Sequence, residues 1–228
     1  MSILKWKKTT VVFILLGMLV LSGCLNRTST TDEMYTVLEN VVDLEQDFEQ
    51  QQEPLVELER EEKEIYSKII ELGMKEFDQI VTLSEEALTI VDKRKEHMDK
   101  EEASIQASKQ EFEKLVPLME ELEDEEIKTK AKELYEIMQK RFATHDTLYE
   151  NYINGIEYDK ELYQMFQQEE LSIDQLEEQI TKINDTYKIV LESNEQFNEF
   201  TEQYNEIKLQ FYTAAGIEIS EEQAEEGD

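Results

Sequence analysis

The residue with the most distinctive chemistry is Cys24, the only cysteine of the chain. Its thiol is a nucleophile in the deprotonated form, and the sulfur can carry a diacylglyceryl group as a thioether. Ser22 and Gly23 are small enough for a peptidase to approach the bond just before Cys24, and Leu21 precedes them. These four residues therefore predict cleavage before the cysteine and lipid attachment to its sulfur.

The residues before this tetrapeptide have the order of a secretory signal. Three of residues 5–8 are lysine, and an apolar run extends from Val11 to Leu21. This run is shorter than the roughly 20 residues that a membrane-spanning helix needs. The tetrapeptide resembles a bacterial lipobox, so residues 1–23 are predicted to be a lipoprotein signal peptide. The alternative is an uncleaved signal anchor with an incidental cysteine. A diacylglyceryl group supplies the two acyl chains that stable anchoring takes.

The two histidines are the next candidates for chemistry. His97 precedes Glu101 by one helical turn, a spacing that suits a metal, but a nearby glutamate is expected by chance in so acidic a chain. We therefore interpret His97 as solvated. His145 falls on an apolar seam between Phe142 and Tyr149. It is predicted to be a buried polar residue that helps to fix helix register, with a ligand or proton-switch role as the alternative.

A cluster of aromatic residues could stack on sugar rings, but most of its members keep helical spacing and so favour core packing. Tyr158 lies off this spacing and is the candidate for glycan contact; the set is Tyr149, Tyr152, Tyr158, Tyr163 and Phe166. The chain has no nucleophile elbow, zinc-protease helix, phosphate loop or paired cysteines. We accordingly predict no catalytic residue, metal site or cofactor.

The composition points to long helices with a strongly acidic surface. The formal charge is −32, and removal of residues 1–23, which hold three lysines and no acid, takes it to −35. Such a charge argues against nucleic acid or anionic lipid headgroups as partners, and favours basic or metal-bridged ones. Only six glycines and two prolines are present, while 39% of the residues are apolar, enough for a core. A lone cysteine excludes an internal disulfide.

The first predicted helix follows a short tether. Residues 24–31 are predicted to be the lipidated cysteine and its tether, which reaches at most about 25 Å when stretched. Thr30 and Glu33 have capping-box spacing and predict a helix start. Pro54 predicts a second start or a kink near residue 53, because proline is tolerated at the first turn of a helix. The folded domain is expected over residues 32–216.

Two adjacent apolar seams run from residue 65 to residue 91 and predict one helix that packs against at least two others. The seams are Ile65, Ile69, Leu72, Ile80, Leu83, Ala87 and Ile90, and Ile70, Met74, Phe77, Val81, Leu88 and Val91. Between Asp92 and Ser104 the apolar pattern almost vanishes. This stretch is predicted to be a helix–helix turn or an exposed segment.

The second half of the chain has clearer boundaries. The acids that follow Asp124 favour a helix start there, and apolar steps of three and four continue from Ile127 to Phe166. Ser172 with Gln175 has capping-box spacing, and Leu171 with Leu176 that of a hydrophobic staple.

The helix predicted over residues 173–215 ends where Gly216 suits a left-handed C-cap and Ile217 can fold back on Tyr212. Residues 217–228 are predicted to be a disordered acidic tail. The expected fold is all-α: an elongated antiparallel up-and-down bundle of three to four long helices with coiled-coil-like packing.

Two stretches of the sequence resemble a known family. Residues 48–88, and residues 200–216 (FTEQYNEIKLQFYTAAG), are similar to the YkyA-type cell-wall-binding lipoproteins of Gram-positive bacteria. The resemblance extends over nearly the whole mature chain and includes the lipobox. It implies an elongated helical fold on the extracellular face of the cytoplasmic membrane. No ligand residues are carried over from the family.

These observations predict a non-catalytic surface lipoprotein that binds the cell wall, with the lipid bilayer as partner through diacylglyceryl-Cys24. The high negative charge favours glycan strands of peptidoglycan, or bridging through divalent ions, over anionic wall polymers. The alternative hypothesis is a helical scaffold that binds and positions a membrane or cell-wall enzyme.

Overall fold

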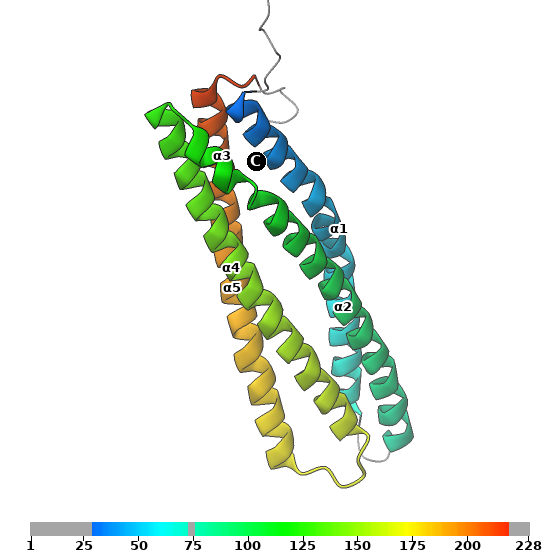
Figure 1. Cartoon of the computed structure of the whole chain (residues 1–228). Helices are drawn as coiled ribbons and strands as arrows, with labels where there is room; N and C mark the ends of the chain where they lie inside the picture. The colour runs from blue at the N-terminus through cyan, green and yellow to red at the C-terminus, as the bar shows by residue number, and fades with distance from the viewer. Residues whose placement is uncertain (1–28, 73–75, 219–228) are drawn as a thin grey trace, which may run out of the picture.

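The computed structural model describes residues 29–72 and 76–218. The predicted signal peptide, the lipidation site at Cys24 and residues 219–228 of the predicted acidic tail lie outside the described residues. Within the described part the chain forms four long helices and one short one: α1 (Thr30–Glu71), α2 (Phe77–Phe112), α3 (Leu115–Glu121), α4 (Glu125–Phe166) and α5 (Ile173–Ala215). The long helices alternate in direction along an elongated bundle (Figure 1). The all-α prediction is confirmed, with four long helices.

The heptad spacing of the buried residues accounts for the coiled-coil-like packing of the bundle. In α2 and α4 the buried positions alternate in steps of three and four, the 3.5-residue period that keeps a seam facing its neighbours. The α2 seam is Ala87, Val91, Arg94, Met98, Glu101, Ile105, Ser108 and Phe112. The α4 seam is Ala131, Leu134, Met138, Arg141, His145, Leu148, Tyr152, Gly155, Asp159, Leu162 and Phe166. Several of these core positions are charged or polar.

Polar caps fix the starts of two long helices. The hydroxyl of Ser29 accepts from the backbone N–H of Asp32 at 3.1 Å, and the Asp32 carboxylate accepts from the N–H of Ser29 at 3.2 Å. The predicted capping box of Thr30 and Glu33 is therefore wrong by one residue, and Thr30 and Thr31 are helical instead of belonging to the tether. The start predicted at Asp124 is confirmed, because its carboxylate accepts from the backbone N–H groups of Glu126 and Ile127 at 2.9 and 3.1 Å.

Helix α5 begins after Ser172, as predicted, but the Ser172 hydroxyl makes no capping hydrogen bond. Its end is confirmed in detail. Gly216 adopts φ 70°, a left-handed conformation that glycine takes without steric cost. The N–H of Ile217 then donates to the carbonyl of Tyr212 at 3.0 Å, which satisfies one of the last carbonyls of the helix.

The prediction of one helix over residues 65–91 is wrong. Helix α1 ends at Glu71, where the backbone of Leu72 turns to an extended conformation, and α2 begins at Phe77. The first apolar seam is shared by the two helices, because its residues on α1 and α2 are buried in the same core. Ile70 of the second seam is exposed instead. Of the two alternatives predicted near residue 53, a helix start or a kink, the start is wrong, since Pro54 lies inside α1.

The turn or exposed segment predicted between Asp92 and Ser104 is likewise wrong, because α2 runs through it without a break. Arg94, Glu101 and Ser104 in this stretch are buried. The stretch faces the core with polar side chains, which hides the apolar pattern of a buried helix.

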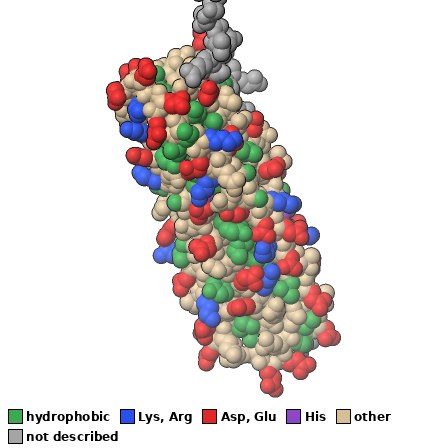
Figure 2. Space-filling model, in the orientation of Figure 1, with side chains coloured by type: hydrophobic (Ala, Val, Ile, Leu, Met, Phe, Trp, Pro, Cys, Tyr) green, Lys and Arg blue, Asp and Glu red, His purple; other side chains and the backbone are tan. Residues whose placement is uncertain are grey.

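Three of the four sides of the bundle are formed by closely packed helix pairs, and the side between α1 and α5 is not. Helix α1 packs along α2, α2 along α4, and α4 along α5. The chain termini of the described part lie at one end of the bundle, close to α3 (Figure 1). Buried apolar residues form one cluster near that end, around Phe112 and Phe142, and a second toward the opposite end, around Ile156 and Tyr163. Acidic side chains are spread widely over the face that Figure 2 shows.

Candidate binding groove

The first and last long helices do not pack closely against each other along their length, so the bundle has an open side between α1 and α5. Two aromatic contacts cross this side. The rings of Tyr35 and Tyr212 lie 5.2 Å apart at the end near the termini, and those of Phe48 and Phe197 lie 5.6 Å apart farther along. The open side is therefore a groove that the Phe48–Phe197 contact divides into two clefts.

We call the two hollows the distal cleft and the proximal cleft, by their distance from the chain termini. The distal cleft, of about 760 Å³, lies between residues 48–66 of α1 and residues 180–197 of α5. The proximal cleft, of about 630 Å³, lies between residues 39–50 of α1 and residues 201–212 of α5. Side chains of α2 and α4 form the floor of the distal cleft, and Arg141 of α4 contributes to the proximal one.

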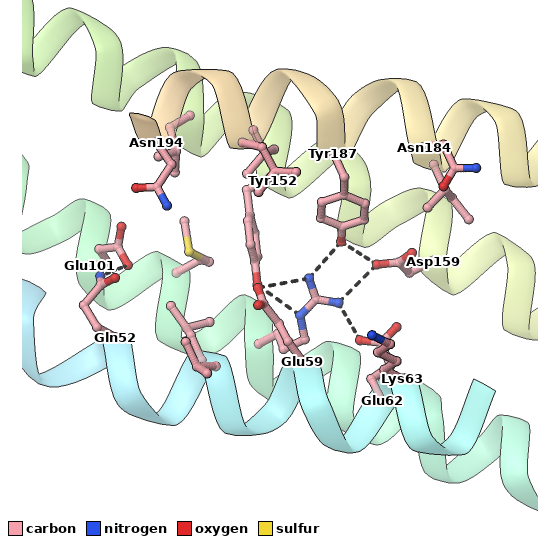
Figure 3. A pocket seen from close by; sticks show the side chains of 18 of the residues that line it. Gln52, Glu59, Glu62, Lys63, Glu101, Tyr152, Asp159, Asn184, Tyr187 and Asn194 are labelled. Atoms are coloured by element: carbon pink, nitrogen blue, oxygen red, sulfur yellow. Dashed lines mark hydrogen bonds and ion pairs between the residues drawn. The ribbon is translucent and has the colours of Figure 1, made fainter. Parts of the chain in front are cut away.

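An arginine from α2 occupies the centre of the distal floor. The Arg94 side chain is 4% exposed and contacts residues of the other three long helices (Figure 3). Its Nη1 donates to Glu62 Oε2 of α1 at 2.5 Å and to Asp159 Oδ2 of α4 at 3.1 Å. Its Nε donates to the Tyr152 hydroxyl at 3.0 Å and its Nη2 to the Tyr187 hydroxyl at 2.8 Å. We call these five residues the Arg94 cluster.

The two phenols of the Arg94 cluster donate hydrogen bonds to carboxylates. The Tyr187 hydroxyl donates to Asp159 Oδ2 at 2.5 Å, and the Tyr152 hydroxyl donates to Glu59 Oε1 at 2.6 Å. Both rings also face the guanidinium, with centroids 5.0 and 5.7 Å from its carbon. Figure 3 shows Glu59 and Glu62 reaching the cluster from α1 and Tyr187 from α5, on opposite sides of the cleft.

The Arg94 cluster holds more negative than positive charge. One guanidinium faces two carboxylates, Glu62 and Asp159, whose side chains are 9% and 8% exposed. Glu59 adds a third at the edge of the cleft. Burial raises the pKa of Glu62 and that of Asp159, and the attraction of Arg94 offsets only part of this. The surplus carboxylate is the feature that most distinguishes this site from an ordinary buried salt bridge.

Gly155 of α4 makes room for the phenol of Tyr187. A methyl group at Gly155 would lie 2.8 Å from Cζ of Tyr187, closer than carbon atoms approach without a shift. Glycine within a helix costs about 1 kcal/mol relative to alanine. Its presence at a buried heptad position is therefore explained by the access it gives Tyr187 to Arg94 and Asp159.

His145 forms a second polar layer at the boundary of the two clefts. It is fully buried, as predicted. Its Nε2 lies 3.1 Å from Glu101 Oε1, and its Nδ1 lies 3.3 Å from Glu102 Oε2. Burial alone would lower the pKa of His145, but Glu101 and Glu102 outweigh burial and raise it. The role in helix register is supported by these contacts, which join α2 to α4.

A third polar layer lies on the proximal side. Arg141 makes two hydrogen bonds of 2.8 Å to the carboxylate of Glu45 on α1. Its Nε donates to the hydroxyl of Thr201 on α5 at 2.8 Å, and its guanidinium lies 4.4 Å from the centroid of the Phe197 ring. Ser108 of α2 also donates to Glu45 at 2.8 Å. One cation and one carboxylate are thus paired, with further hydrogen bonds from Arg141 to Thr201 and from Ser108 to Glu45.

The other residues singled out from the sequence lie in different places. His97 is half-buried and its Nδ1 lies 2.8 Å from Gln51 Oε1. The aromatic residues expected in the core divide, with Tyr152, Tyr163 and Phe166 buried and Tyr149 only half-buried. Tyr158 is half-buried on α4 and lines neither cleft. Glycan contact by Tyr158 remains a prediction.

The Arg94 cluster is not among the predictions from the sequence. Asp159 stands out there only as an interruption of the apolar steps between Ile127 and Phe166. A signal was nevertheless present. Asp159 lies three residues after Ile156 and four before Tyr163, and Arg94 lies three after Val91 and four before Met98. A charge at a heptad core position predicts a buried ion pair, because an unpaired charge there is very costly.

The side chains that line the two clefts are suited to binding a ligand. Across the described ranges, no three or more His, Cys, Asp or Glu side chains are grouped so as to hold a metal ion. In the same part of the chain none of the helices is long and apolar enough to cross a membrane. What the groove offers is a line of apolar, amide and charged side chains along an open face.

The fold and the groove define an all-α protein, a bundle of four long helices with an open polar side. Residues 29–214 match the family described as "Putative cell-wall binding lipoprotein", the YkyA family, and the chain belongs to this family. It is 35% identical over 201 residues, 88% of this chain and 90% of the relative, to an uncharacterized lipoprotein, YkyA, of Bacillus subtilis (strain 168).

A solved structure is similar in fold. A crystal structure of a conserved protein of unknown function from Staphylococcus aureus superposes with a TM-score of 0.69 and 16% identity. The match covers 81% of this chain and 96% of the other. At this identity the likeness concerns the fold alone.

Proposed function

We propose that this chain is a lipid-anchored, non-catalytic surface protein that binds cell-wall material in the groove between α1 and α5. The observation that carries the proposal is the open side of the bundle, where two clefts follow one another along the same pair of helices. A groove of this form suits an extended, linear ligand, since successive units can lie in successive hollows. The family description points in the same direction.

The proposed anchor adds a constraint on where binding takes place. Lipid on Cys24 would hold Ser29, the cap of α1, within a few residues of the membrane. The distal cleft begins at residue 48, about 28 Å farther along α1 at 1.5 Å per residue. A bundle that stands on the membrane would therefore present this cleft to the inner wall, on the extracellular face of the cytoplasmic membrane.

The binding test is sedimentation of the full-length chain, held in a non-ionic detergent, with isolated peptidoglycan. We expect enrichment in the pellet at moderate salt, and we include a calcium arm because divalent ions reduce repulsion between acidic surfaces. Absence from the pellet in both arms would contradict the proposal.

A second candidate function is a scaffold that positions a membrane or cell-wall enzyme. Val42, Val56 and Leu191 line the clefts and are exposed apolar side chains, which favours a protein partner that covers them. Crosslinking in cells distinguishes the two functions. Recovery of a second protein on α1 and α5 supports the scaffold, and recovery of wall polymer alone contradicts it.

A further inference from the structure

The distal cleft combines an apolar rim with an acidic floor. Val56 of α1 and Leu191 of α5 line it from opposite helices and are 62% and 64% exposed, although both are large and apolar. Four carboxylates line the same cleft, those of Glu59, Glu62, Glu101 and Asp159. A ligand that satisfies both features has an apolar stem and a positive end.

The carboxylates that line the distal cleft outnumber its cations, so the charge balance favours binding of one more cation. Lys63 and Arg94 are the two permanent cations that line the distal cleft. Lys63 is exposed at the edge, so Arg94 is the only one on the floor. His145 also lines the cleft; its Nε2 is hydrogen-bonded to Glu101, and its Nδ1 lies 3.3 Å from Glu102 Oε2 without a hydrogen bond. The carboxylates of Glu59, Glu62 and Asp159 therefore share a single buried guanidinium.

We propose that the distal cleft binds a primary ammonium group carried on an aliphatic stem, as found on the diamino-acid side chain of a cell-wall peptide. The ammonium would lie among Glu59, Glu62 and Asp159, and the stem would pass between Val56 and Leu191. This inference rests on the proposed function and names the part of the wall that the groove recognises.

Other cations fit the site less well. A calcium ion takes six to eight oxygen ligands, whereas oxygens of Glu62 and Asp159 already accept from Arg94. A ligand guanidinium is a broad planar group that would have to fit beside the guanidinium of Arg94. An ammonium is a compact charge with three donors on a flexible stem, and the Tyr66 and Tyr187 rings that line the cleft offer faces that attract it.

Amide side chains on α5 supply the remaining polar contacts. Asn184 and Asn194 line the distal cleft on either side of Tyr187. Each carries donors and an acceptor, which match the N–H and carbonyl groups of a peptide backbone. The cleft thus has chemistry for a short peptide with one long cationic side chain.

The test uses two tripeptides that differ in one acetyl group. The probes are Nα-acetyl-L-lysyl-D-alanyl-D-alanine, with a free side-chain ammonium, and the same peptide acetylated on that nitrogen. Binding to the full-length chain in detergent is measured by isothermal titration calorimetry at pH 7.5. We expect the free ammonium to lower Kd at least tenfold relative to the acetylated peptide.

Two variants of the same chemistry on the same helix locate the effect. Glu59→Gln removes a carboxylate at the cleft edge and keeps an acceptor for Tyr152, so it should weaken binding of the free-ammonium peptide at least fivefold. Glu53→Gln removes an exposed carboxylate of α1 that does not line the cleft and should leave Kd unchanged. Equal effects of the two variants would overturn the inference.

The outcomes also separate this inference from the proposed function. Equal binding of the two peptides, or binding of neither while peptidoglycan still sediments the protein, overturns the inference and leaves the function standing. Binding of the free-ammonium peptide without sedimentation by peptidoglycan supports the inference and contradicts the function. Failure of both measurements overturns both.

Discussion

The two buried arginines of the bundle differ in how their charge is met. Arg141 faces one carboxylate, Glu45, in a two-fold hydrogen-bonded pair, and the charges balance. Arg94 faces the buried carboxylates of Glu62 and Asp159 and is bonded by two tyrosines as well. A balanced pair is complete within the fold, whereas the surplus carboxylate of the Arg94 cluster is compensated only by a proton or a bound cation. This difference separates a structural layer from a candidate binding site.

The largest expected effect comes from removal of each arginine in turn. Arg94→Met leaves two buried carboxylates without a cation and should lower the free energy of unfolding by about 3–5 kcal/mol. Arg141→Met leaves one carboxylate that is partly exposed and should cost about 2 kcal/mol. Urea denaturation followed by circular dichroism measures both. Arg94→Lys, which keeps the charge, is the control if Arg94→Met does not fold. Equal losses of unfolding free energy in the two variants would contradict the proposed difference between the two sites.

Gly155→Ala tests the packing that admits Tyr187 to the Arg94 cluster. Alanine is the better helix former by about 1 kcal/mol, yet the clash with the Tyr187 ring should make the change destabilising by about 1–3 kcal/mol. Asn154→Ala, at the exposed neighbouring position, should be neutral or slightly stabilising. The loss should shrink when Tyr187→Leu removes the ring. If Gly155→Ala were stabilising, the Tyr187 ring would be able to move away from the added methyl group, and the packing explanation for the glycine would be wrong.

The His145 layer is expected to respond to pH. Because the pKa of His145 is raised in the folded state, its stabilising contribution is complete below the unfolded pKa of about 6.5 and is lost as pH rises through the folded pKa. His145→Gln should therefore cost about 1–3 kcal/mol in mild acid and less at pH 8.5. The difference in unfolding free energy between wild type and variant, measured across this range, isolates the histidine from the general acidity of the chain. A difference independent of pH would contradict the assignment.

The smallest expected effect on stability concerns the rim of the distal cleft. The double variant Val56→Asp, Leu191→Asp changes two exposed side chains and should alter the free energy of unfolding by no more than about 1 kcal/mol, or about 0.5 kcal/mol for each surface substitution. Thermal unfolding by circular dichroism checks this. A loss well above 2 kcal/mol would mean that the rim belongs to the core, and that the groove is closed in solution.

Much of the fold was predictable from the sequence, because most heptad core positions are apolar and several helix ends have local caps. Asp124 and Gly216 mark their boundaries by chemistry that acts within one helical turn. The turn between Glu71 and Phe77 was not found, since the apolar seams of two helices run into each other there and Gly73 is the one local signal in the sequence.

The candidate site was not predictable in the same way. Arg94, Glu62 and Asp159 come from three helices that are far apart in the sequence, and each alone resembles a solvated charge in an acidic chain. Only the heptad register, which places all three at core positions, distinguishes them. The open side between α1 and α5 depends on which helices fail to pack, and no local pattern encodes this.

The central claim, that the groove between α1 and α5 binds the cell wall, is tested most directly by sedimentation of two matched double variants with isolated peptidoglycan. One is Val56→Asp, Leu191→Asp in the groove. The other is Ile70→Asp, Ile173→Asp, which adds the same charge at exposed apolar positions that line neither cleft. We predict that the groove variant loses at least nine-tenths of the pelleted protein while the other sediments like the wild type. Sedimentation of the groove variant at the wild-type level would contradict the account.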